Sequence, residues 1–199
     1  MIESIIFCSN NSHKLDEVKS ILISAGITVL SLSDLDIRIE IKETGNTYIE
    51  NAGIKTRAIY KYMQTNSIPF PPHCLLVADD TGIEIKQFDG APGIHTHRFQ
   101  IEHNGELQTN TFIINELKGD RSASFVCALS ILNQHGKETI IQERVNGKIS
   151  TTLRGKDGFG YDPIFIPDGY DESYAEMSSE KKNAISHRAM AFKTFLTIA

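Results

Sequence analysis

Two adjacent carboxylates, Asp79 and Asp80, are the residues of this chain best suited to chemistry. They follow the apolar run 75–78, which predicts a buried strand, and precede Thr81-Gly82, which predicts a turn. Loops at strand ends often carry catalytic groups on a rigid frame. Adjacent side chains of a strand point to opposite faces, so one acid is expected in a given cleft. We predict that it is Asp80, as a metal ligand or general base, although turn capping also explains such an aspartate.

A polar run, Ser9-Asn10-Asn11-Ser12-His13-Lys14, separates an expected strand at 5–8 from an expected helix that Gly26 ends. Backbone N–H groups at a helix N-terminus favour an anion, and Lys14 adds positive charge. The run has no glycine and no Gly-Lys-Ser/Thr, so it is not a Walker-type loop. Helix capping explains its Ser and Asn residues but not its lysine. The run is therefore a candidate phosphate site with capping as the alternative.

The elements between this run and the acids are expected to be two strands and a helix. Residues 28–30 predict a strand, and the alternation of isoleucine with charged residues over 37–42 predicts a half-exposed one. A capping-box pattern predicts a helix over 47–62. Asn51 and Lys55, four residues apart, share a face of this helix, which we expect to be solvated.

The second half of the chain predicts a helix, a hairpin and a second candidate site. The helix is expected over 109–117, and strands over 122–132 and 139–149 are joined by a hairpin turn. Residues 154–163 form a glycine-punctuated loop with two aromatic residues, which suits close approach to a planar ring. In the expected final helix, His187 points away from the apolar stripe and Arg188 lies at its flank, as on an exposed basic face.

Composition excludes several classes of protein. The 199 residues fit one domain, with or without two lobes, and the net charge of −5 argues against nucleic-acid binding. An apolar span of 18 residues and a basic leader are both missing from the sequence, so we expect no membrane insertion. Three distant cysteines in apolar surroundings suggest reduced thiols and a cytoplasmic protein. The pair His95-x-His97 lacks the further ligands of a zinc site.

Six short motifs, in order along nearly the whole chain, resemble the inosine triphosphate pyrophosphatase family. Each motif alone is weak, but their order makes the resemblance specific. They are Ser9-x-Asn11-x-x-Lys14-x-x-Glu17, Glu43-Thr44-Gly45-x-Thr47-x-x-Glu50-Asn51-Ala52, Ala78-Asp79-Asp80-Thr81-Gly82, Gly90-x-Pro92-Gly93, Gly158-Phe159-Gly160-Tyr161-Asp162-Pro163-Ile164-Phe165, and Lys182-Asn183-x-Ile185-Ser186-His187-Arg188.

The resemblance implies a single α/β domain over 1–199, with two lobes, a long mixed β-sheet, flanking helices and a central nucleotide cleft. It implies a homodimer that hydrolyses ITP, dITP and XTP to the monophosphate and pyrophosphate with Mg²⁺. It also assigns residues by position. Asp80 is the general base and a metal ligand with Glu43, and Thr81 contacts substrate. The residues that would bind the triphosphate are Ser9, Asn10, Asn11, Ser12, His13 and Lys14, and Lys55 would offset its charge. The residues that would bind the base and ribose are Phe159, Gly160, Tyr161, Asp162, Lys182, His187 and Arg188.

One departure leaves the metal site open. The family often has two acids before Thr-Gly, and the first is Lys42 here, so Glu43 or Glu40 could join Asp80. A pyrophosphatase for modified pyrimidine nucleotides and a nucleotide-binding regulator without catalysis remain alternatives. A Rossmann-type dehydrogenase is excluded because no Gly-x-Gly-x-x-Gly follows the first strand. The sequence does not specify the preferred nucleotide, the residue that rejects GTP or the geometry of the dimer.

Overall fold

Six strands form one mixed sheet in the computed structural model, which describes residues 2–198. Their order is β2-β1-β3-β4-β5-β6; β1 is parallel to β2 and β3, and β5 is antiparallel to β6. The α/β prediction with a mixed sheet is therefore confirmed. The strands are β1 (Ser4–Phe7), β2 (Thr28–Ser31), β3 (Cys74–Ile85), β4 (Ser122–Leu132), β5 (Glu138–Ile149) and β6 (Phe165–Pro167).

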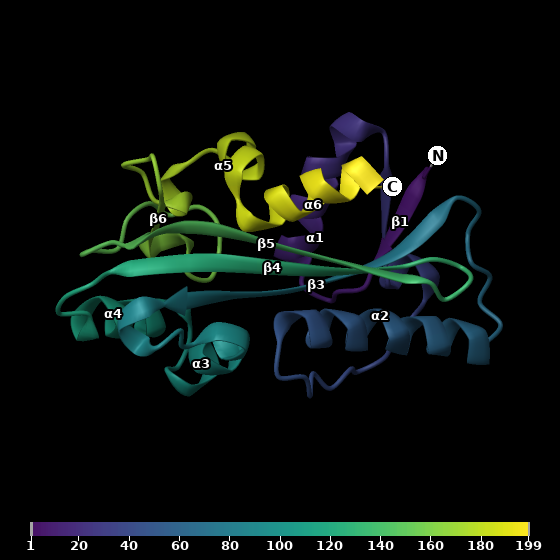
Figure 1. The fold of residues 1–199 in the computed structure, drawn as a ribbon, viewed down its shortest axis with the longest axis horizontal. Helices are drawn as coiled ribbons and strands as arrows, with labels where there is room; N and C mark the ends of the chain where they lie inside the picture. Colours follow the sequence, from purple (N-terminus) through teal and green to yellow (C-terminus); the bar gives the residue numbers. More distant parts are fainter. Residues whose placement is uncertain (1, 199) are drawn as a thin grey trace. The chain divides into compact units, whose positions relative to one another are not determined.

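The helices flank this sheet (Figure 1). They are α1 (Ser12–Leu22), α2 (Tyr48–Thr65), α3 (Thr96–Glu102), α4 (Glu106–Glu116), α5 (Ser179–Ile185) and α6 (His187–Ile198). The helices predicted after the polar run, over 47–62 and over 109–117, correspond to α1, α2 and α4. None of the helices described for residues 2–198 is long and apolar enough to cross a bilayer.

The chain divides into two compact units, and β3, β4, β5 and α6 each contribute residues to both. The first unit comprises Met1–Asp80, Cys127–Glu143 and Arg188–Ala199, and the second comprises Thr81–Val126 and Arg144–His187.

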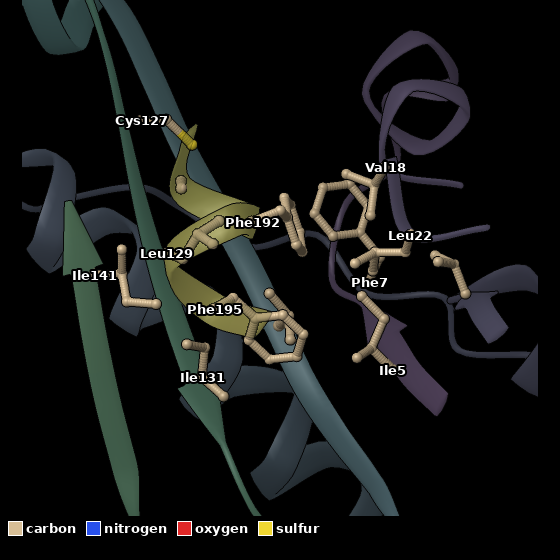
Figure 2. Close-up of a cluster of buried hydrophobic side chains, with 13 residues drawn as sticks. Ile5, Phe7, Val18, Leu22, Cys127, Leu129, Ile131, Ile141, Phe192 and Phe195 are labelled. Atoms are coloured by element: carbon tan, nitrogen blue, oxygen red, sulfur yellow. The ribbon is translucent and has the colours of Figure 1, made fainter. Parts of the chain in front are cut away.

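In the first unit, helices cover both faces of the strands. Figure 1 shows α1 and α6 on one face and α2 on the other. The α1/α6 face is an apolar layer in which Phe192 and Phe195 pack between β4 and β1, with Phe192 facing Phe7 and Val18 (Figure 2). The centroids of the Phe7 and Phe192 rings are 6.4 Å apart. The α2 face buries Ile59 and Met63 of the helix against β1 and β3, in a separate cluster.

Alternation along β1 and β3 sorts their side chains between these two layers. Phe7 and Val77 lie in the α1/α6 layer, and Leu76 and Ala78 lie in the α2 layer. Continued along β3, the same alternation sends Asp79 toward α1 and α6 and Asp80 toward α2. The sheet therefore decides which helices each carboxylate meets.

The second unit has its own core around the remaining parts of β3, β4 and β5. Ile113 of α4 is buried in it with Ile83, Phe125 and Phe165. The Phe125 and Phe165 rings meet edge to face, with centroids 4.8 Å apart. This core supports the glycine-punctuated loop, whose Tyr161 is buried in the same cluster.

Two local predictions are wrong. The predicted turn at Thr81-Gly82 does not form, because β3 continues through it to Ile85 and sheet pairing overrides the local preference. The predicted strand over 37–42 is neither strand nor helix. Its alternating isoleucines arise because Ile37, Ile39 and Ile41 pack against the α2 layer without joining the sheet.

Candidate active site

The carboxylate of Asp79 is completely buried and held by cations from two helices. The Lys14 ammonium of α1 donates to its Oδ1 at 3.1 Å, and Arg188 of α6 donates to its Oδ2 from Nε at 3.1 Å and from Nη2 at 2.9 Å. The remaining guanidinium nitrogen of Arg188 pairs with Glu17 of α1. Burial opposes ionisation of Asp79, but Lys14 and Arg188 outweigh it and hold the pKa of this carboxyl well below its usual range.

Asp80, on the opposite face of β3, is held by two side chains of α2. Asn51 Nδ2 donates to its Oδ2 at 3.2 Å, and the Lys55 ammonium donates to its Oδ1 at 3.4 Å. Asp80 is 5% exposed. Burial raises the pKa of its carboxyl above the usual value, because the nearby cations Lys55 and Lys14 do not fully compensate for lost water.

Lys55 also connects Asp80 to the segment that precedes α2. Its ammonium lies 3.1 Å from Glu43 Oε1 and 3.4 Å from Asp80 Oδ1. Burial works to lower the pKa of Lys55, but Asp80, Asp79 and Glu43 outweigh it and raise it. Asn51 and Lys55 are 3% and 8% exposed, so the predicted solvated face of α2 is wrong. Residues of the sheet cover this face of α2, and the sequence of α2 alone does not reveal them.

The polar run begins α1, as predicted. Asn11 is the N-cap and accepts from the Lys14 N–H at 3.1 Å, while Ser9 Oγ accepts from the Asn11 N–H at 3.2 Å. Asn10, Ser12 and His13 are exposed. Burial lowers the pKa of Lys14, although Asp79 opposes that shift. The run therefore caps a helix and also places a cation beside the acids.

The predicted base-binding residues of the 154–163 loop form a second group, within the second unit. Asp162 Oδ2 accepts from the Phe159 N–H at 2.8 Å and from the Lys182 ammonium at 2.5 Å. That ammonium lies 4.8 Å from the centroid of the Phe159 ring and 5.8 Å from that of Tyr174. Gly158 is required here, since its φ is +76° and an added Cβ would lie 2.2 Å from Asp162 Oδ2.

Neighbouring helices hold the same loop. Buried Asn110 of α4 donates to the Gly160 carbonyl at 2.9 Å, and the Tyr161 hydroxyl donates to the Thr96 carbonyl at 2.8 Å. His187 stacks on Phe125, with ring centroids 4.5 Å apart and planes at 7°. The prediction that His187 and Arg188 are exposed is wrong, because they are 4% and 1% exposed at the start of α6.

The structure thus brings together Lys14, Arg188 and Asp79 on one face of β3, and Lys55, Glu43 and Asp80 on the other. Thr81 follows Asp80 in β3 and is half-buried. Sequence reasoning gave no role to Asp79, Asn51 or Glu17. Alternation along a strand places Asp79 and Asp80 on opposite faces, which indicates that each acid needs its own partners.

Comparisons with known proteins agree in pointing to one family. The sequence model of the Ham1 family matches residues 5–198. The dITP/XTP pyrophosphatase of Clostridium perfringens is 36% identical over 196 residues, which cover 96% of this chain and 95% of that protein. The protein of the same name from Bacillus subtilis is 37% identical, covering 97% and 95%.

Solved structures agree with the sequence relatives. The Ham1 protein of Staphylococcus aureus superposes with a TM-score of 0.81 at 31% identity, covering 98% of this chain and 97% of that one. A HAM1 protein of Coxiella burnetii gives the same TM-score at 34% identity and covers both chains completely.

Proposed function

The chain belongs to the Ham1 family, and on that premise we propose that it hydrolyses ITP, dITP and XTP to the monophosphate and pyrophosphate. The observation that carries this proposal is the buried cluster around Asp79 and Asp80. Two lysines from different helices, the half-buried Lys14 and the buried Lys55, lie beside the acids, an arrangement suited to a polyanionic substrate and a charged transition state. Such an enzyme would remove non-canonical purines from the nucleotide pool.

A divalent cation, Mg²⁺, fits the Glu43 and Asp80 carboxylates. The Lys55 ammonium already lies within 3.4 Å of both, so the two groups converge on one cationic position. Among residues 2–198 no three His, Cys, Asp or Glu side chains are grouped to hold a metal. Mg²⁺ needs no such group, since it usually takes one or two carboxylates and completes its shell with waters and substrate phosphates. When bound, it would neutralise phosphate charge.

The chain's own residues would divide the remaining work. Asp80 would orient the attacking water and accept its proton, which suits a carboxylate whose pKa is raised by burial. Ser9, Asn10, Asn11, Ser12, His13 and Lys14 would bind the triphosphate, and Lys14 and Lys55 would offset charge on the departing pyrophosphate. Thr81 would contact substrate. Phe159 would stack on the purine, with Gly160, Tyr161, Asp162, Lys182, His187 and Arg188 holding base and ribose.

We also propose a cellular location and an oligomeric state for the protein. The three cysteines are free and buried, which is compatible with reduced thiols in the cytoplasm. We propose a cytoplasmic homodimer that binds neither nucleic acid nor membrane. Sedimentation at several concentrations tests the dimer, and a monomer at micromolar concentration would contradict it.

One assay tests the function directly. Pyrophosphate release is measured with ITP, XTP, GTP and ATP at equal concentration and with Mg²⁺. We expect pyrophosphate as the first product and ITP and XTP as the preferred substrates. Direct release of orthophosphate would contradict the proposed cleavage site. Turnover confined to modified pyrimidine nucleotides, or nucleotide binding without turnover, would favour the alternative enzyme or the regulator.

A further inference from the structure

Asn51 bonds the Asp80 carboxylate and the backbone of Gly45, two residues after Glu43, so it connects the two segments that carry the proposed metal ligands. We propose that Asn51 is a positioning residue, which fixes the Glu43 segment and Asp80 relative to each other through one amide group. This inference rests on the proposed function, because it concerns the same metal site. It adds a residue that touches neither substrate nor metal and acts through Glu43 and Asp80.

The two ends of the Asn51 amide have different obligatory partners. Its Oδ1 accepts from the Gly45 N–H at 2.9 Å, and its Nδ2 donates to Asp80 Oδ2 at 3.2 Å. A backbone N–H requires an acceptor and a carboxylate requires a donor, so the amide has one productive orientation. Because Asn51 is 3% exposed, water cannot readily replace either partner, and losing one would leave a buried group unpaired.

The Glu43 segment depends on such external contacts. Residues 37–45 form no helix or strand, so no regular backbone pairing fixes Glu43. Two hydrogen bonds to α2 hold the end of the segment: Gly45 N–H to Asn51, and Asn46 N–H to Glu50 Oε2 at 2.6 Å. An added Cβ on Gly45 would lie 2.8 Å from Asn51 Oδ1 and 2.6 Å from Glu50 Cβ. The close approach of this backbone to Asn51 therefore requires glycine.

A neutral amide suits this position better than a second cation. Lys55 already donates to Asp80 Oδ1 and Glu43 Oε1, whereas Asn51 takes the other Asp80 oxygen. Two carboxylates and one ammonium leave one net negative charge, which attracts a divalent cation. A second lysine in place of Asn51 would cancel that charge. Asn51 gives Asp80 a fixed direction without that loss.

The first test is metal affinity, measured without turnover. Free Mn²⁺ is followed by electron paramagnetic resonance during titration of the full chain and its Asn51→Leu variant. Partners that orient metal ligands typically contribute about 10–100-fold to metal affinity, so we expect a loss in that range. Thr56→Val is the matched control. Thr56 lies in the same helix, is fully buried and bonds Ser130 at 2.6 Å, so its loss should leave Mn²⁺ affinity within about twofold.

Two further variants keep the inference falsifiable if Asn51→Leu fails to fold. Gly45→Ala keeps the Asn51 amide but adds a Cβ that would lie 2.8 Å from its Oδ1, so it should force the Glu43 segment and Asn51 apart and also weaken Mn²⁺ binding. A double-mutant cycle combines Asn51→Leu with Glu43→Gln. Asn51→Leu should lower Mn²⁺ affinity by a smaller factor when Glu43 is already replaced, because both substitutions act on the same metal ligand, Glu43.

The outcomes separate this inference from the proposed function. Unchanged Mn²⁺ affinity in Asn51→Leu or Gly45→Ala, an equal loss in Thr56→Val, or no Mn²⁺ binding by the unaltered chain would each overturn the role of Asn51. None of these results depends on nucleotide turnover. Failure of the unaltered chain to release pyrophosphate from ITP would overturn the function, whatever the Asn51 variants do.

Discussion

Asp79 and Asp80 are adjacent in β3, yet their carboxylates lie on opposite faces of the sheet and, within residues 2–198, bond different side chains. Asp79 bonds Lys14 and Arg188, whereas Asp80 bonds Asn51 and Lys55. The pKa of Asp79 is lowered and that of Asp80 is raised. The same residue type therefore serves two purposes. Asp79 is a permanent anion that organises cations, and Asp80 is a less compensated carboxylate suited to chemistry.

Replacing Asp80 by Asn should abolish most turnover. The substitution keeps the size of the side chain but removes the proton acceptor and one ligand charge. We expect kcat for ITP to fall about 10²–10⁴-fold, as when a positioned acid–base group is removed. Nucleotide binding without metal, followed by calorimetry, should persist. Near-normal turnover by a correctly folded Asp80→Asn protein would refute the catalytic assignment.

Replacing Asp79 by Asn should instead affect stability. The variant leaves the buried Arg188 and the half-buried Lys14 without their common counter-ion. Breaking a buried ion pair from one side typically costs about 3–5 kcal/mol in the free energy of unfolding. Urea denaturation monitored by circular dichroism measures this loss. Asp80→Asn is the matched comparison, and an equal or larger loss in that variant would contradict the division of roles.

The acids should also give opposite slopes of stability against pH in metal-free protein. Asp79 has a depressed folded pKa, so its contribution is present above the unfolded value, about 3.9, and is lost as pH falls toward the folded pKa. Asp80 has a raised folded pKa, so its contribution is present below the unfolded value and is lost as pH rises.

Thermal denaturation of the unaltered chain and of Asp80→Asn tests the second slope. Their midpoints should converge in acid, where both side chains are neutral, and Asp80→Asn should gain relative stability as pH rises. Added Mg²⁺ should then raise the denaturation midpoint of the unaltered chain more than that of Asp80→Asn. A constant difference across pH 4–8 would show that ionisation of Asp80 carries no cost in the fold.

Local patterns predicted the elements better than the site. The apolar run before Asp79, the helix caps and the hairpin of β4 and β5 are short-range signals, and the structure contains those elements. The environment of Asn51 could not be read in this way. On α2 alone it is a polar residue beside Lys55, and its burial follows from Asp80, 29 positions later in the chain.

Arg188 shows the same limit from the other direction. Helical periodicity placed it on the flank of the last helix, among exposed basic residues. The structure buries it because Glu17 and Asp79, from distant parts of the sequence, neutralise its charge. Helical periodicity assigns only apolar residues to the buried face, so it predicts that a charged residue of a buried ion pair is exposed. The ion pairs of Arg188 with Glu17 and Asp79 can be identified only from the three-dimensional arrangement of α1, β3 and α6.

Discrimination between ITP and ATP should depend on the group at C6 of the purine. Hypoxanthine carries an oxygen at C6 where adenine carries an amino group, so hydrogen-bond donors suit ITP and would be left unpaired by ATP. A site built in this way can discriminate about 10⁴–10⁵-fold. The candidate donors are Lys182, the backbone N–H groups of residues 158–162, and Arg188. Arg188→Ala should lower kcat/KM for ITP strongly and for ATP hardly at all, which narrows their ratio.

Two comparisons make this test specific to Arg188. Phe159→Ala should lower kcat/KM for both nucleotides alike, because ring stacking does not distinguish the groups at C6. Asp79→Asn disturbs the same ion pair without removing the guanidinium, so it controls for loss of the Arg188 anchor. If Arg188→Ala and Asp79→Asn reduce ITP and ATP turnover in parallel, Arg188 is a structural partner of Asp79. In that case the donor to the 6-oxygen would be Lys182 or a backbone N–H group of residues 158–162.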